Sequence, residues 1–166
     1  MSDLKTLQDI MDCLVKARLR MAVAESLTCG GLQSAIGSIS GASNFFEGGI
    51  TVYNLDQKVR LLGVNREHAK SVNSVSPRVA DELACGVCSL FGADIGIGTT
   101  GYAEPDQQHG IDKPMAYFAI WQRTEERAWS HVTSQVFGEG LTRIEMQQHV
   151  VDSVLKALTL FLGRTP

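Results

Sequence analysis

The chain has 166 residues, of which 44% are hydrophobic and 20% are charged, and its net charge is -3. These values are typical of one globular domain with a sizeable core, which excludes disordered and fibrous proteins. The negative charge offers no broad basic surface for nucleic acid, and no apolar run approaches the ~20 residues that a membrane helix needs. The N-terminal segment is acidic where a signal peptide would be basic and apolar, so we expect a cytoplasmic protein.

The first part of the chain predicts a helix, a strand and a second helix. Apolar residues repeat at helical spacing over residues 3–18. A short apolar strand over residues 21–24 follows, and residues 25–31 then form a polar turn that contains glycines. Residues 32–39 again favour a helix. A buried strand that leads through a glycine-bearing turn into a helix is a common place for a ligand in α/β proteins.

The middle of the chain begins with a turn at Gly41–Ser43 and continues as a short strand at Ile50–Tyr53. A short helix after Asn54 closes at Gly63, which suits a left-handed cap. Ser76 and the proline after it are well suited to the N-cap and first position of the next helix.

The last part of the chain combines a glycine-interrupted strand, a hairpin and a helix. The strand covers residues 95–100, and its glycines indicate a ligand or another backbone at close range. Residues 115–122 and 129–137 read as two strands joined by a charged turn, and a capping box at Thr142–Glu145 opens the final helix. This alternation predicts an α/β protein of one domain over residues 1–166. We expect a three-layer α/β/α sandwich whose mixed sheet includes an antiparallel hairpin.

Two of the four cysteines form a C-x-x-C pair, Cys85 and Cys88. A redox pair of the thioredoxin type needs a helix N-terminus, whereas this pair falls in the middle of a helical pattern. A structural zinc site would need two further ligands at suitable spacing, and the sequence has no second pair. We therefore interpret both cysteines as small buried residues and expect neither a metal nor a cofactor.

One stretch, residues 41–58, carries three side chains suited to acyl transfer: Ser43, Tyr53 and Lys58. A serine is a weak nucleophile until a base takes its proton, and a neutral lysine or a tyrosinate can be that base. A turn serine, a strand tyrosine and a surface lysine also occur together by chance. Spacing alone therefore leaves both a catalytic and a structural role open.

Two loops lie where ligands bind in such folds, beyond the carboxyl ends of the strands. Each combines hydroxyl groups with glycines, which let backbone N–H groups approach an anion such as phosphate. The candidate binding residues are Glu25, Ser26, Thr28, Gly30, Thr100 and Gly101. The alternative is that these glycines only make tight turns.

Eight motifs resemble, in order and at matching separations, those of the CinA C-terminal domain family, the nicotinamide-nucleotide amidohydrolases. They are A-E-S-x-T at Ala24–Thr28, G-A-S at Gly41–Ser43, T-V-Y-N at Thr51–Asn54, Lys58, L-L-G-V at Leu61–Val64, V-S at Val75–Ser76, T-G-x-A-x-P at Thr100–Pro105 and K-P at Lys113–Pro114. The resemblance covers essentially the whole chain.

The resemblance implies an α/β/α domain, often dimeric, that hydrolyses the carboxamide of nicotinamide mononucleotide to nicotinic acid mononucleotide and ammonia without a metal. It implies a catalytic set of Ser43, Tyr53 and Lys58, with Lys58 or Tyr53 as the base. It also implies a small-molecule nucleotide as the partner, a homodimer or higher homo-oligomer as the assembly, and a role in pyridine nucleotide salvage.

Several positions depart from the family pattern. Leu27 and Cys29 replace the cysteine and first glycine of E-S-C-T-G-G, and a β-carbon at Cys29 could block a close backbone approach. Glu104 replaces a glycine of the family and would place a carboxylate near a substrate phosphate. Of the arginine-bearing pattern near the last helix, only Arg143 is matched, and Gln147 stands where a second arginine would fall.

These departures leave three hypotheses for the function. The first is an amidohydrolase active on nicotinamide mononucleotide, and the second is a hydrolase of a different, less anionic amide. The third is a catalytically silent paralogue that binds a nucleotide or another protein. The serine, tyrosine and lysine that the family resemblance carries over speak against the third.

Overall fold

The computed structural model describes residues 4–123 and 129–163, and their centre is a five-stranded mixed sheet in the order β2-β1-β3-β4-β5. The strands are β1 (Met21–Glu25), β2 (Phe46–Thr51), β3 (Ile95–Tyr102), β4 (Met115–Arg123) and β5 (Trp129–Phe137). β1 pairs in parallel with both β2 and β3, whereas β3, β4 and β5 pair antiparallel. The expected hairpin is therefore confirmed.

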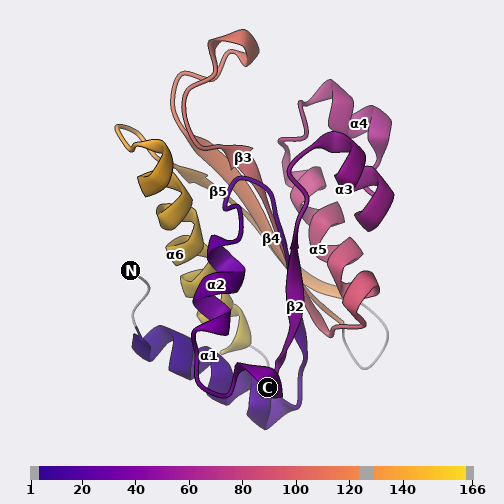
Figure 1. Ribbon diagram of the computed structural model, residues 1–166, viewed down its shortest axis with the longest axis vertical. Coiled ribbons are helices and arrows are strands. Elements are labelled where there is room, and N and C mark those ends of the chain that lie inside the picture. Colours follow the sequence, from indigo (N-terminus) through magenta and orange to yellow (C-terminus); the bar gives the residue numbers. More distant parts are fainter. Residues whose placement is uncertain (1–3, 124–128, 164–166) are drawn as a thin grey trace.

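Helices cover both faces of the sheet. The helices are α1 (Leu4–Ala17), α2 (Gly31–Gly37), α3 (Leu55–Leu62), α4 (Arg66–Ser71), α5 (Pro77–Phe91) and α6 (Arg143–Leu162). Figure 1 shows α1, α2 and α6 on one face and α3, α4 and α5 on the other. Each face has its own apolar cluster, one around α6 and one around α5. The predicted three-layer α/β/α sandwich is confirmed.

Local sequence explains where the two long helices start. The Ser76 hydroxyl accepts the Val79 N–H, and Pro77 occupies the first turn of α5. At α6 the Thr142 side chain and Glu145 form the reciprocal bonds of a capping box. Both starts lie where the sequence places them, because a cap depends only on neighbouring residues.

The glycines of β3 allow α5 to lie directly on the sheet. A β-carbon at Gly96 would come within 2.1 Å of the Ala84 carbonyl oxygen, and one at Gly98 within 2.4 Å of the Ala80 carbonyl oxygen. Of the two explanations that a glycine-interrupted strand offers, the close approach of another backbone is the correct one.

Three features differ from the sequence-based expectation or extend it. β2 covers residues 46–51, so the predicted strand at Ile50–Tyr53 was placed too late, and α4 was not expected. Of the two cysteines expected to be buried, Cys88 is buried in α5 and Cys85 is only partly buried. Burial raises the pKa of the Cys88 thiol to about 12, which keeps it protonated at neutral pH. None of the helices in the described ranges combines the length and hydropathy that a membrane crossing needs.

Candidate active site

The carboxyl ends of β1 and β2 bring two segments of the chain together at one edge of the sheet. Ser26 directly follows β1, and Lys58 lies in the first turns of α3, which follows β2. The Asn54 side chain caps α3 by accepting the Gln57 N–H at 3.0 Å. Side chains alternate along a strand, so Glu25 points toward α2 while Ser26 points toward α3.

Lys58 contacts the Ser26 hydroxyl. The distance from Lys58 Nζ to Ser26 Oγ is 2.9 Å. Nζ also donates to the carbonyl oxygens of Val52 at 2.7 Å and Tyr53 at 3.0 Å. The side chain of Lys58 is 1% exposed, although no carboxylate contacts Nζ among the described residues.

Burial changes the acid–base behaviour of this lysine. Removing the charged amine from water lowers the pKa of Lys58 from 10.5 to about 8. A substantial fraction of the amine is therefore neutral near physiological pH, as a base requires. Of the two possibilities that the sequence left open, a neutral lysine or a surface lysine, the burial of Lys58 favours the first.

The structure does not bring Ser43 to this lysine, so the expected convergence of Ser43 with Lys58 is wrong. Ser43 is exposed in a short 3-10 helix (Ala42–Asn44) that precedes β2, whereas Lys58 follows β2. The six residues of β2 lie between them, which corresponds to about 20 Å of strand at ~3.3 Å per residue. The hydroxyl beside the amine is that of Ser26, which the sequence suggested only as a binding residue.

The glycine-bearing loop after β1 has no free site for phosphate at the start of α2. Glu25 is completely buried, and its carboxylate accepts the N–H groups of Gly30, Leu32 and Gln33 at 2.8–3.1 Å. The N–H of Gly31 is bonded to the Thr28 carbonyl. The protein's own carboxylate therefore occupies the position where a helix N-terminus would hold an anion, and Glu25 and Gly30 lie outside the pocket described below.

Two predicted threonines fix the loops around Ser26. The Thr28 hydroxyl lies 2.8 Å from that of Thr99, and both side chains are buried. The Thr100 hydroxyl donates to the Ser74 carbonyl at 2.6 Å. Because Ala24 pairs with Gly98, Ser26 comes level with Thr100 on the same face of the sheet. Thr99, which the sequence did not single out, holds Ser26 by accepting its N–H at 3.1 Å.

A pocket of about 500 Å³ opens next to the loop that follows Ser26, although Ser26, Thr28, Thr100 and Lys58 are not among its lining residues. Its lining includes Leu27, the neighbour of Ser26, and Tyr53, whose carbonyl binds Lys58. The remaining lining residues are Gly101, Tyr102, Ala103, Glu104, Pro105, Asp106, Gln107, Gln108 and Arg143. The predicted residues Tyr53, Gly101 and Arg143 thus face a single pocket.

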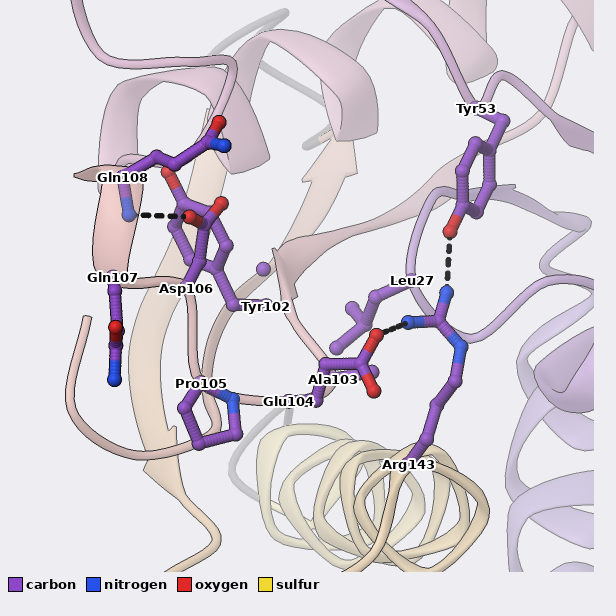
Figure 2. Close-up of a pocket in the computed structure, with 11 residues that line it drawn as sticks. Leu27, Tyr53, Tyr102, Ala103, Glu104, Pro105, Asp106, Gln107, Gln108 and Arg143 are labelled. Atoms are coloured by element: carbon purple, nitrogen blue, oxygen red, sulfur yellow. Dashed lines mark hydrogen bonds and ion pairs between the residues drawn. The ribbon is translucent and has the colours of Figure 1, made fainter. Parts of the chain in front are cut away.

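Figure 2 shows Arg143 reaching from the start of α6 toward two other side chains of the pocket. Its guanidinium donates to Glu104 Oε1 at 2.9 Å and to the hydroxyl oxygen of Tyr53 at 2.6 Å. The Tyr53 hydroxyl is therefore engaged by Arg143, while only its carbonyl meets Lys58. This arrangement favours Lys58 over Tyr53 as the base.

Two other departures from the family pattern have visible consequences. Cys29 is exposed and adopts φ 49°, the left-handed region that glycine occupies without strain. Gln147, at the position of the missing arginine, donates from Nε2 to the Leu27 carbonyl at 2.7 Å. Gln147 therefore supports the loop that follows Ser26 and adds no charge to the pocket.

Residues 3–162 match the CinA C-terminal domain family. The chain belongs to this family. The CinA C-terminal domain described here is 40% identical over 123 residues to a CinA-like protein of Picosynechococcus sp., covering 74% of this chain and 29% of that protein. It is 44% identical over 107 residues to a CinA-like protein of Chlorobium limicola, and this match covers 64% of this chain and 25% of that protein. The chain thus spans less than a third of the length of these relatives.

Solved structures share the fold of this CinA C-terminal domain. A CinA superfamily protein from Enterobacter cloacae is 26% identical with a TM-score of 0.86, and the match covers 98% of each chain. A competence damage-inducible protein A from Klebsiella pneumoniae has a TM-score of 0.89 at 24% identity, again over 98% of each chain. These matches agree with the α/β architecture and with the family assignment from the sequence.

Proposed function

We propose that this CinA C-terminal domain is an amidohydrolase in which Ser26 attacks a carboxamide carbon and Lys58 is the general base. The observation that carries the proposal is the 2.9 Å contact between Lys58 Nζ and Ser26 Oγ, made by a buried lysine whose pKa is lowered to about 8. A serine with a base in hydrogen-bond reach is the arrangement that nucleophilic catalysis needs.

The surroundings of Lys58 suit the neutral amine. A neutral amine has two N–H donors and one lone pair, whereas an ammonium ion has three donors. The carbonyl oxygens of Val52 and Tyr53 can only accept, so they take both N–H groups of the neutral form. The lone pair is then left for the hydroxyl proton of Ser26. Two carbonyls and one hydroxyl therefore orient the base toward its nucleophile.

The reaction follows from this arrangement. As Ser26 Oγ bonds to the carboxamide carbon, Lys58 accepts the hydroxyl proton and becomes an ammonium ion. Lys58 then gives that proton to the departing nitrogen, which leaves as ammonia while an ester forms on Ser26. A water molecule attacks the ester with Lys58 as base, which releases the carboxylic acid and restores the serine.

Backbone amides next to Ser26 are suited to stabilise the oxyanion. Within the described residues, the N–H groups of Leu27 and Thr28 make no hydrogen bond, whereas that of Ser26 is held by Thr99. Donors that are fixed before the reaction stabilise a developing oxyanion without reorganisation. The Gln147 bond to the Leu27 carbonyl helps to keep this segment in place.

The substrate that the family resemblance implies is nicotinamide mononucleotide, with nicotinic acid mononucleotide and ammonia as products. A pocket of about 500 Å³ is within the usual range for small-molecule sites. The exposed ring of Tyr53 offers a surface on which the positively charged pyridine ring could lie.

The test is ammonia release from a panel of carboxamides that includes the mononucleotide, measured with the wild type, Ser26→Ala and Ser43→Ala. We expect Ser26→Ala to lower kcat/KM by about three orders of magnitude or more, because the nucleophile is lost. Ser43→Ala is the matched control, an exposed serine at the other end of β2, and should retain wild-type turnover. Loss of turnover in Ser43→Ala with activity kept in Ser26→Ala would overturn the assignment.

A further inference from the structure

The charged side chains that line the pocket have an unexpected balance. Among the described lining residues there are two carboxylates, Glu104 and Asp106, and one guanidinium, Arg143. A hydrogen bond from His109 lowers the pKa of Asp106, so this carboxylate stays ionised at neutral pH. Because the pocket carries more negative than positive charge, it repels an anionic ligand.

The side-chain cations near the pocket and the amides at the start of α2 are already bonded to atoms of the protein, and the N–H groups of Leu27 and Thr28 are those proposed above for the oxyanion. Arg143 donates through both terminal nitrogens, to Glu104 and to Tyr53. The amine of Lys58 is buried and bonded to Ser26 and two carbonyls. The amides at the start of α2 are bonded to Glu25 and to the Thr28 carbonyl.

We propose that this site takes a carboxamide without a phosphate group, neutral or cationic, and that Glu104 is the residue that discriminates against phosphate. This inference rests on the proposed amidohydrolase function and narrows its substrate class. Glu104 acts in two ways, because its carboxylate repels a phosphate directly and also occupies the guanidinium of Arg143.

A pyridinium carboxamide fits the same charges. Its ring is positive, so the carboxylates of Glu104 and Asp106 attract it. The side chain of Tyr53 is 55% exposed at the pocket, which suits contact between a cation and an aromatic face. A ring that carries an unphosphorylated sugar keeps both attractions and avoids the repulsion.

The experiment compares two ligands that differ only by a phosphate, nicotinamide riboside and nicotinamide mononucleotide. Their dissociation constants are measured by calorimetric titration in a Ser26→Ala background, which prevents turnover. We expect the riboside to bind about tenfold more tightly than the mononucleotide, because the Glu104 carboxylate would repel a phosphate placed a few ångströms from it. This preference should weaken as salt concentration rises.

Glu104→Gln removes the charge of this residue and keeps its size. In this variant we expect the mononucleotide to bind about tenfold more tightly and the riboside to bind equally or slightly less tightly. Glu139→Gln is the matched control. Glu139 is a highly exposed carboxylate that pairs with Lys113 outside the pocket lining, so this variant should keep the original preference.

Three results would overturn the inference: tighter binding of the mononucleotide than of the riboside, an equal response of both ligands to Glu104→Gln, or binding of neither. Ammonia release by the wild type shows whether the substrate preference or the proposed hydrolase function has failed. Turnover that depends on Ser26 but prefers the mononucleotide would reject only the discrimination by Glu104. The expected binding pattern without turnover of any amide would reject the hydrolase.

Discussion

Replacing Lys58 by methionine tests the buried base without any knowledge of the substrate. Lys58 is 1% exposed, and burial lowers its pKa from 10.5 to about 8. Because the folded-state pKa lies below that of the unfolded chain, the unfolded state binds more protons between pH 8 and 10.5. The stability of the wild type should therefore rise with pH across this window, and below pH 8 the buried charge is destabilising.

The size of the effect follows from the two pKa values. Each pKa unit corresponds to about 1.36 kcal/mol, so the full change approaches ~3 kcal/mol. With a pKa of about 8 in the folded state and 10.5 in the unfolded state, the unfolding free energy should rise by about 2.5 kcal/mol between pH 7 and pH 10. The Lys58→Met variant has no titratable group at this position, and it lacks the hydrogen bonds to Val52, Tyr53 and Ser26 at every pH.

The assay is urea unfolding of both proteins from pH 7 to pH 10. The difference in unfolding free energy, wild type minus Lys58→Met, should increase by about 2.5 kcal/mol over this range, because groups common to both proteins cancel. Lys70→Met removes an amine from the exposed surface of α4 and controls for the loss of a lysine in general. A difference that stays constant within about 0.5 kcal/mol would refute the argument, since the linkage relation then leaves no lowered pKa at Lys58.

Three further predictions concern the same region. The kcat/KM for a carboxamide should rise about tenfold per pH unit up to pH ~8 and then level off, because only neutral Lys58 is a base. Lys58→Arg, which stays protonated, should lose turnover at every pH, and an arginine variant with the wild-type pH profile would exclude this role. Cys29→Gly should raise the unfolding free energy by ~1 kcal/mol in urea, since it relieves the positive φ, whereas Cys29→Ala keeps a β-carbon and should not. Equal stability of these two cysteine variants would contradict that reasoning.

The sequence predicted the architecture well because much of it is specified locally. The N-cap at Ser76 and the capping box at Thr142 place the starts of α5 and α6. The alternation of strands and helices, followed by two strands around a charged turn, correctly indicated a mixed sheet. The motifs in register correctly indicated the CinA family.

The predicted site was less accurate, because the family resemblance pointed to the G-A-S turn and closeness in the sequence does not ensure closeness in space. Ser43 and Lys58 are only fifteen positions apart in the chain, yet β2 runs between them and separates them. Ser26 is thirty-two positions from Lys58, and the parallel pairing of β1 with β2 brings the two together. A usable signal was present in the sequence: Ser26 follows its strand, whereas Ser43 precedes one. Ligands in such sheets bind at the carboxyl ends of strands.

The electrostatic part of the site could not be read from the sequence. The sequence places Glu25 in a polar glycine-bearing turn, where an acid ordinarily faces water, but in the structure it ends β1 and is buried and bonded to the start of α2. The link from Glu104 through Arg143 to Tyr53 joins three segments that are 39 to 90 positions apart. Such contacts depend on how the layers of the fold meet, which no local pattern encodes.

Two of the acceptors that surround Lys58 are main-chain oxygens, and this determines how the surrounding sequence can change. The identity of the side chains at Val52 and Tyr53 does not affect the oxygens that hold the amine. In a saturation scan, many residue types at the exposed position 53 should therefore leave the base intact, with proline and insertions as exceptions because they displace the backbone. Val52 is buried in an apolar cluster, so position 52 should accept only apolar residues of similar size. A lineage could thus remodel the wall of the pocket at position 53 and acquire new ligands while it keeps the same pair of reacting groups.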